Sequence, residues 1–322
     1  MKQAENSWFW QDYWRRGPVA CCLADDLCAG YDGALAAGWH SFFLGLGKGM
    51  QVLDLCTGNG GVALLGAQAS TANNKAFDIT GVDLALIEPA TNVPAHREAL
   101  QSITFDGGVD ATDLPFGDVT FDAVTSQFGV EYAGMDAALD EAARVLKDGG
   151  RLRLVIHAVE GIAEAAARAE YALVGSFDFV ELHNSLRTAL VAVNSLTRGI
   201  GTKPAADAAV EAYIAAMEGL EAELARHPNQ ATILTLGRDL MTLFGALESM
   251  PIADVLERVD ASERAVDAHR LRLEALMAAA CDEKAIESVC ERLGKLGIDA
   301  NFHSASDGDG NMLAWIVEGV KE

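Results

Sequence analysis

The stretch Val52-Leu53-Asp54-Leu55-Cys56-Thr57-Gly58-Asn59-Gly60-Gly61 decides the fold of this 322-residue chain. Its apolar first half predicts a short buried strand, and its glycines let the backbone turn tightly and approach a ligand closely. Residues 62–67 predict a helix that begins at this turn, where unpaired backbone N–H groups attract an acceptor-rich or anionic group. The order of strand, glycine turn and helix predicts a ligand-binding loop. A plain glycine turn of any α/β protein would have the same sequence pattern.

Strands and helices alternate after this loop. Residues 135–146 predict a helix that the glycine pair Gly149-Gly150 ends. The remaining apolar runs predict strands at residues 76–82, 103–105, 121–126 and 151–157. This alternation indicates a doubly wound, mostly parallel sheet.

Polar residues follow the predicted strands. Ligands of such sheets bind beyond the carboxyl ends of the strands, so these residues are candidates for a binding site. They are Asp83, Asp110, Ser126, Gln127 and His157.

The alternation stops at about residue 158, and helical periodicity continues to about residue 280 in some five helices, with breaks that include His227-Pro228-Asn229. Asp282 then predicts the N-cap of a helix, and residues 298–304 and 312–320 predict two final strands. We therefore expect a discontinuous first domain, residues 1–158 and 281–322, in which residues 1–50 form N-terminal cap helices. Residues 159–280 would be a helical insertion that acts as a lid, a substrate-binding element or a dimer element.

The N-terminal segment is dense in aromatic residues. Such residues bury large areas, either as surface anchors of a helix or as a flap over an apolar ligand. Both interpretations remain open for Trp10, Tyr13 and Trp14.

Composition limits the class of partner. A formal net charge of −23 argues against nucleic acid and anionic membrane surfaces. No apolar run is long enough to span a membrane and residues 1–6 lack a signal-peptide pattern, so we expect a cytoplasmic protein. The six cysteines, Cys28 among them, show no CxxC spacing, which indicates reduced thiols and no structural metal.

Four ordered motifs resemble the class I S-adenosylmethionine-dependent methyltransferases, of the subgroup that includes the quinone C-methylases. The resemblance covers residues 50–157 and implies a Rossmann-like sheet of seven strands, mostly parallel, with the helical insertion after strand five. The motifs are Asp54–Gly60, Asp110–Phe116, Ser126–Tyr132 and Ala143–Gly150. Cys56 stands where the family usually has a glycine.

The resemblance implies S-adenosylmethionine as cofactor and S-adenosylhomocysteine as product. Asp83 would accept hydrogen bonds from both ribose hydroxyls, a task that suits a carboxylate. Asp110 would receive the adenine amine and Ala111 would offer its backbone N–H. The remaining expected cofactor-binding residues are Asp54, Cys56, Thr57, Gly58, Asn59, Gly60, Leu84, Ser126, Gln127, Trp10, Tyr13 and Trp14.

A dinucleotide-binding dehydrogenase is the competing interpretation, because residues 58–63 also fit the pattern GxGxxA. Asp54 counts against it, since a carboxylate before the loop would repel a pyrophosphate. The Asp110 loop has no role in a dehydrogenase, whereas a cationic, phosphate-free cofactor is compatible with both carboxylates.

We expect methyl transfer to an apolar or aromatic small molecule. The protein then contributes mainly orientation, with a base for some acceptors. The candidate base is His157, although a histidine that only caps a strand end is the more common case; Tyr132, Glu131 and His183 are weaker candidates. The alternative is a non-catalytic protein that binds S-adenosylmethionine or S-adenosylhomocysteine and uses its helical part for partner binding or self-association. A homodimer remains open in either case.

Overall fold

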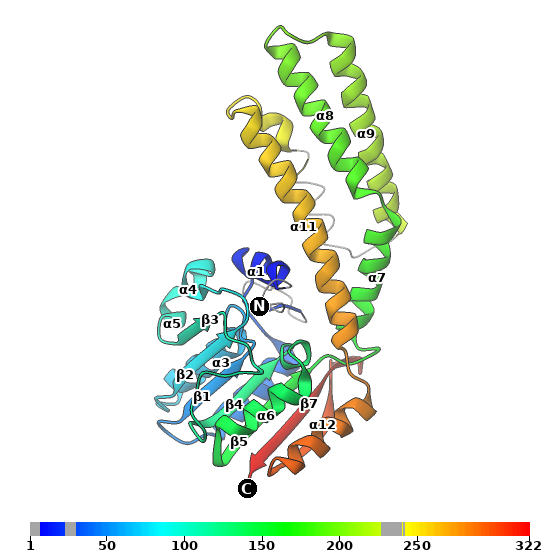
Figure 1. Ribbon diagram of the computed structural model, residues 1–322. Helices are drawn as coiled ribbons and strands as arrows, with labels where there is room; N and C mark the ends of the chain where they lie inside the picture. Colours follow the sequence, from blue (N-terminus) through cyan, green and yellow to red (C-terminus); the bar gives the residue numbers. More distant parts are fainter. Residues whose placement is uncertain (1–6, 23–29, 227–239, 241) are drawn as a thin grey trace. The chain divides into compact units, whose positions relative to one another are not determined.

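A seven-stranded sheet forms the centre of the first of two compact units in this computed structural model (Figure 1). The structure describes residues 7–22, 30–226, 240 and 242–322. Cys28 and the predicted break at residues 227–229 lie outside this part of the chain. Unit 1 comprises Met1–Ala166 and Ala275–Glu322, and unit 2 comprises Ala167–Glu274.

The strands run in the order β3-β2-β1-β4-β5-β7-β6, with β7 antiparallel to both of its neighbours and the remaining pairs parallel. This arrangement confirms the predicted fold class. The strands are β1 (Gln51–Leu55), β2 (Asp78–Asp83), β3 (Thr104–Gly107), β4 (Phe121–Gln127), β5 (Leu146–Ile156), β6 (Ile298–Ser306) and β7 (Met312–Lys321).

Helices cover both faces of the sheet, because both faces of its central strands are apolar. Val52 packs on the face covered by α2 and α3, whereas Leu53 and Leu55 pack on the face covered by α6 and α12. The helices of unit 1 are α1 (Trp8–Arg15), α2 (Gly33–Leu44), α3 (Gly61–Ala72), α4 (Pro89–Asn92), α5 (Arg97–Leu100), α6 (Met135–Val145) and α12 (Glu283–Lys295), with short 3₁₀ turns η2 (Pro94–His96) and η3 (Val130–Tyr132).

One predicted boundary, the start of β5, is wrong, and another, the start of α12, is confirmed. The helix α6 ends at Val145, and the next strand begins at once at Leu146 and runs through the glycine pair, where a connecting loop was predicted. Leu146 pairs with Phe121 of β4, and the pairing resumes at Arg151 after a register shift, so the glycine pair lies in an irregularity within the strand. The predicted N-cap is confirmed, because the Asp282 carboxylate accepts a hydrogen bond from the Ala285 backbone N–H at 2.8 Å.

Unit 2 is helical and has its own apolar core. Phe179, Leu182, Leu186 and Leu190 recur at helical spacing on α8 and are buried there. Helices α8 and α9 pack side by side (Figure 1). Described helices that lie wholly or partly in this unit are α7 (Ile162–Ser176), α8 (Phe179–Thr197), α9 (Lys203–Arg226) and α11 (Ile252–Ala279).

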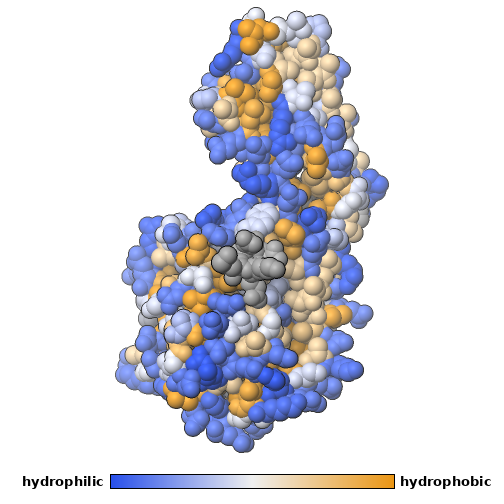
Figure 2. All heavy atoms as spheres, viewed as in Figure 1, coloured by the Kyte–Doolittle hydropathy of each residue, from blue (hydrophilic) through white to orange (hydrophobic). Residues whose placement is uncertain are grey.

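The surface agrees with the acidic composition. Hydrophilic residues dominate the visible face of the sheet-containing unit, with apolar residues in smaller patches between them (Figure 2). Among the described residues, the helices lack the long apolar run that crossing a bilayer requires.

Candidate functional site

Asp54 lies at the end of β1 and braces the loop that follows. One carboxylate oxygen accepts a hydrogen bond from the Thr57 hydroxyl at 2.6 Å and the other from the Thr125 hydroxyl at 2.8 Å. Burial raises the pKa of Asp54 to about 6, although these two hydrogen bonds act in the opposite direction. The carboxylate therefore joins the loop to β4 and would be stabilised further by a cationic ligand.

The loop backbone takes the left-handed conformation at three positions. Gly58 has φ +55° and Gly60 has φ +85°, as their lack of a side chain allows. Cys56 has φ +52°, a value that L side chains rarely adopt. This geometry explains why the resembling family has a glycine at this position and shows that the cysteine accommodates the same turn.

Asp83 ends β2 beside this loop. Its two oxygens accept hydrogen bonds from the backbone N–H groups of Gly58 and Ala85, both at 2.8 Å. Burial raises the pKa of Asp83 to about 6, and the two backbone hydrogen bonds oppose this rise. Because a carboxylate oxygen has two lone pairs, each oxygen can accept one more donor from a ligand.

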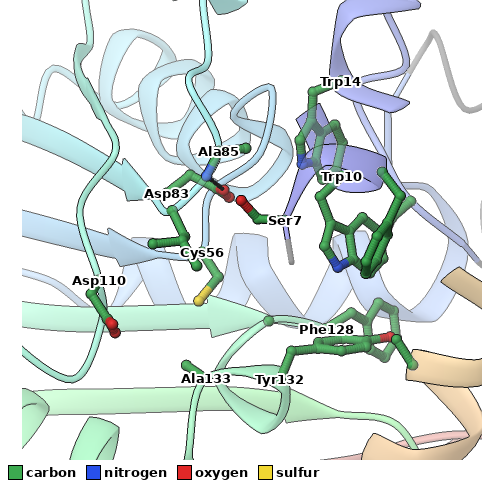
Figure 3. Close-up of a pocket in the computed structure, with 15 residues that line it drawn as sticks. Ser7, Trp10, Trp14, Cys56, Asp83, Ala85, Asp110, Phe128, Tyr132 and Ala133 are labelled. Carbon is green, nitrogen blue, oxygen red and sulfur yellow. Dashed lines mark hydrogen bonds between the residues drawn. The ribbon is translucent and has the colours of Figure 1, made fainter. Parts of the chain in front are cut away.

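A cavity of about 330 Å³ opens at the carboxyl ends of these strands. Asp83 and Asp110 lie on one side of it, and the rings of Trp10 and Trp14 lie on the other (Figure 3). The predicted site residues that line it are Trp10, Trp14, Cys56, Asp83, Leu84, Asp110 and Tyr132. Its volume is in the range of small-molecule sites.

The aromatic wall of this cavity is continuous. Trp10 stacks on Trp14 with ring centroids 6.4 Å apart, and it also packs edge-on against Tyr132 at 5.3 Å. The Trp14 ring also covers Gly58 so closely that a Cβ there would lie 2.3 Å from the ring. Helix α1 is thus fitted to the glycine loop.

A second, smaller cavity of about 20 Å³ is lined by Asp54, Thr57 and Gln127, among others. Four residues line both cavities and so mark their junction: Trp14, Cys21, Cys56 and Phe128. The two cavities together form one candidate binding site, with Asp83 and Asp110 at one end and Asp54 at the other.

Gln127 faces the smaller cavity with an unused donor. Its side-chain oxygen accepts a hydrogen bond from the Trp39 indole N–H, which fixes the orientation of the amide. Its Nε2 is buried and has no hydrogen-bond partner among the described residues. A buried unpaired donor is costly, so this atom indicates a place for an acceptor group of a ligand.

Several predicted cofactor residues lie outside the walls of both described cavities and support the loop or α1 instead. The Asn59 amide donates to the backbone oxygens of Trp14 and Pro18 at 2.7 and 2.8 Å. The Tyr13 hydroxyl donates to the backbone oxygens of Ala20 and Cys21. The predicted residues outside the walls are Tyr13, Gly58, Asn59, Gly60, Ala111, Ser126 and His157.

His157, the candidate base, is almost fully buried, with 1% of its surface exposed. Its ring stacks on Phe128 at 4.1 Å, its Nδ1 lies 2.8 Å from Glu131 Oε1, and its Nε2 lies 3.2 Å from Cys22 Sγ. The Tyr132 hydroxyl makes a long contact of 3.5 Å with Nδ1. His157 therefore faces Glu131 and the cysteine pair, and not the open cavity. His183, on α8, bonds to Ser262 and to the Phe179 backbone inside unit 2.

The structure adds site residues that the sequence interpretation passed over. Cys21 and Phe128 line both cavities, and Phe9 lines the larger one. The adjacent pair Cys21-Cys22 is a sequence signal that could have pointed to this region, but the sequence analysis did not use it. No group of three or more metal-ligating side chains occurs in the described part of the chain.

The raised pKa of Asp83 makes stability depend on pH. Unfolding returns this carboxyl from a pKa of about 6 to its ordinary 3.8, so between these values the native state binds more protons and stability falls as the pH rises. Asp83→Asn removes this effect. We expect the free energy of unfolding of Asp83→Asn, relative to that of the wild type, to be larger at about pH 7.5 than at about pH 5 by about 1 kcal/mol.

Urea unfolding followed by tryptophan fluorescence measures this difference, because all five tryptophans lie in unit 1. Both proteins are compared at both pH values, so that the other carboxyls cancel. An equal stability difference at the two pH values would contradict the raised pKa.

The known proteins that this chain resembles are methyltransferases. Residues 52–150 match the family described as "Methyltransferase domain". A 2-phytyl-1,4-beta-naphthoquinone methyltransferase of Arabidopsis thaliana is 36% identical over 124 residues, which are 38% of this chain and 45% of that protein. A demethylmenaquinone methyltransferase of Staphylococcus aureus is 37% identical over 112 residues, or 33% and 43% of the two chains. The chain thus spans less than half the length of these relatives.

Among solved structures, a 1,6-didemethyltoxoflavin-N1-methyltransferase of Burkholderia thailandensis, with 1,6-didemethyltoxoflavin and S-adenosylhomocysteine bound, is 18% identical. The overlap covers 40% of this chain and 55% of that one, with a TM-score of 0.32.

Proposed function

Because the chain carries a class I S-adenosylmethionine-dependent methyltransferase domain, we propose that it transfers a methyl group from S-adenosylmethionine to an apolar or aromatic small molecule. One observation carries this proposal. The main cavity has carboxylates on one side and a continuous aromatic wall on the other (Figure 3). A polar cofactor and an apolar acceptor would find matching surfaces there.

The residues present fit the cofactor. Asp83 would accept both ribose hydroxyls, and Asp110, with the backbone of Ala111, would bind the adenine. At the other end Asp54 would face the ammonium group of the methionine part, and the unpaired Gln127 Nε2 would donate to its carboxylate. Trp14 and Phe128 line the junction between the two ends, where aromatic faces attract a cation.

S-adenosylmethionine, when bound, supplies a methyl group already activated by the sulfonium charge. The chain then has to orient the acceptor and exclude water. The wall of Trp10, Trp14 and Tyr132 would hold an aromatic ring in van der Waals contact, and it carries few polar groups that could retain water.

This wall and the names of the relatives support one class of acceptor. Two relatives are named for methylating a naphthoquinone and a demethylmenaquinone, both of them apolar ring systems. We therefore favour a reduced quinone or a similar electron-rich aromatic ring as acceptor. The role of the helical insertion, residues 159–280, as a lid, substrate-binding element or dimer element stays a proposal; Ala275, which belongs to unit 1, lines the cavity.

Calorimetry with S-adenosylmethionine and S-adenosylhomocysteine tests the cofactor, and transfer of an isotope-labelled methyl group to a panel of quinols tests the reaction. We expect binding of both nucleosides and a labelled product. Failure to bind either nucleoside would refute the proposal. Binding without transfer to any apolar acceptor would instead favour the non-catalytic alternative.

Gln127→Glu isolates the amino-acid end of the cofactor. The variant keeps the oxygen that accepts from Trp39, but replaces the unpaired donor with an acceptor that carries negative charge. We expect S-adenosylhomocysteine to bind about 100-fold more weakly, because a lost hydrogen bond to a charged group is worth about 1.5–3 kcal/mol.

Adenosine, which lacks the amino-acid part, is the control ligand for this variant. Its affinity should change little between wild type and Gln127→Glu. An equal loss of affinity for both ligands would show that the substitution disturbs the whole site. Unchanged affinity for both would show that Gln127 does not bind the cofactor.

A further inference from the structure

Two adjacent cysteines lie at the cavity without any part in the function proposed above. Cys21 Sγ lies 3.4 Å from Cys22 Sγ and 3.5 Å from the Tyr31 hydroxyl. Cys21 lines both cavities, at their junction. Its sulfur is therefore within reach of a molecule in the cavity.

Cys22 contacts the buried His157, which in turn contacts the carboxyl group of Glu131. Cys22 Sγ is 3.2 Å from His157 Nε2, and His157 Nδ1 is 2.8 Å from Glu131 Oε1. The Glu131 side chain is fully buried, and its second oxygen has no partner among the described residues. The paired oxygen, Oε1, also accepts a hydrogen bond from the His157 backbone N–H at 3.1 Å, so the carboxyl group is fixed beside the imidazole.

The proton positions follow from this chain of contacts. A carboxylate only accepts hydrogen bonds, so His157 Nδ1 carries a proton and donates it to Glu131. The other ring nitrogen is then free to take the Cys22 thiol proton, while Cys22 Sγ takes the proton of Cys21. A proton that leaves Cys21 therefore has a path of contacts through Cys22 to the His157 ring, and the Cys21 sulfur can accept hydrogen bonds from Cys22 and Tyr31.

The pKa shifts of the two thiols agree with proton loss from Cys21 rather than from Cys22. The hydrogen bond with Cys22 lowers the pKa of Cys21, an effect that burial opposes and the Tyr31 hydroxyl supports. Burial raises the pKa of Cys22 well above its ordinary value. Glu131 acts on both cysteines in the direction that disfavours the thiolate. Of the pair, Cys21 is therefore the thiol whose pKa is lowered.

We propose that Cys21 is a nucleophilic thiol that forms covalent adducts with electron-poor small molecules of the α,β-unsaturated carbonyl class in the cavity. The thiolate forms a bond to the β-carbon, and the electron pair of the carbon–carbon double bond moves toward the carbonyl oxygen. The resulting enolate takes up one proton from solvent in the cavity, which replaces the proton that left the Cys21 thiol, so that charge and atoms balance. Elimination reverses these steps.

This site goes beyond the proposed methyl transfer, because addition needs no cofactor. It also bears on the acceptor, since oxidised quinones belong to the same chemical class. A thiolate at the junction would capture such a molecule beside the methyl-donor position.

N-ethylmaleimide is the probe. Reduced, desalted full-length protein is labelled at about pH 7 without cofactor, and peptide mass spectrometry gives a rate for each cysteine. We expect Cys21 to react at least about 10-fold faster than the half-buried Cys290, because the thiolate is the reactive form. Cys22→Ala should slow labelling of Cys21 about 10-fold, and Cys22→Ser should restore most of the rate, since a hydroxyl can still donate to the thiolate.

Glu131→Gln tests the positioning of His157, whose Nδ1 lies 2.8 Å from the Glu131 carboxyl, and should change the pH profile of Cys21 labelling. Equal rates for Cys21 and Cys290, or a Cys21 rate unchanged in Cys22→Ala and Glu131→Gln, would overturn the proposal. Calorimetry with S-adenosylhomocysteine on the same samples is independent of thiol reactivity. It therefore separates failure of this inference from failure of the proposed function.

Discussion

Asp83→Ala should weaken the binding of S-adenosylmethionine and S-adenosylhomocysteine at least about 100-fold. The ribose hydroxyls would lose two acceptors, each worth about 1.5–3 kcal/mol when the acceptor is charged, and about 1.4 kcal/mol corresponds to a tenfold change in affinity. The substitution also leaves the Gly58 and Ala85 N–H groups without their present acceptor. Isothermal titration calorimetry measures the loss directly.

Asp106→Ala is a matched control for this variant. Asp106 is also an aspartate near the end of a strand, pairs in register with Val82 on β2, and is exposed. It should bind both ligands like wild type. If Asp83→Ala did so too, with an unchanged thermal midpoint, the assignment of the cavity to an adenosyl cofactor would be wrong.

Gly58→Ala should both destabilise unit 1 and weaken cofactor binding. The residue has φ +55°, and a Cβ would lie 2.3 Å from the buried Trp14 ring. The left-handed conformation costs about 1–2 kcal/mol for a residue with a side chain, and displacing the ring adds about 1–3 kcal/mol. We expect a loss of about 3 kcal/mol in the free energy of unfolding and a tenfold or greater loss of affinity, because α1 can no longer close on the loop.

Gly49→Ala separates the two contributions. Gly49 has φ +74°, but a Cβ there would meet no atom of the described chain within 4 Å. This variant should lose only about 1 kcal/mol and keep full affinity. Equal losses in the two variants would mean that contact with Trp14 adds nothing, and that α1 is not fitted to the loop.

Much of the fold could be predicted because its signals are local. Val52, Leu53 and Leu55 alternate between the two apolar layers, and such a pattern requires only the period of a strand. Asp83 and Asp110 could be proposed as site residues because parallel strands bring their carboxyl ends to one edge. The start of β5 was predicted wrongly, because the glycine pair signals a helix end locally while pairing with β4 extends the strand.

The directions of side chains could not be predicted in the same way. Asn59 and Tyr13 have the residue types of ligand-binding groups, yet their polar atoms are used to hold α1 and the segment after it. His157 was proposed as a base from its place after a strand, whereas its neighbours in space are Phe128, Glu131 and Cys22. Its role as a base stays a prediction.

The sequence by itself determined the sheet, the glycine loop and the carboxylates at the strand ends, because strand periodicity, turn chemistry and strand-end position are properties of neighbouring residues. Only the tertiary structure decided which of these residues line a cavity and which support it. It also brought Cys22 to His157, which lies 135 positions along the chain. Packing between segments that are far apart in the sequence determines these hydrogen-bond partners, so a local sequence pattern does not predict them.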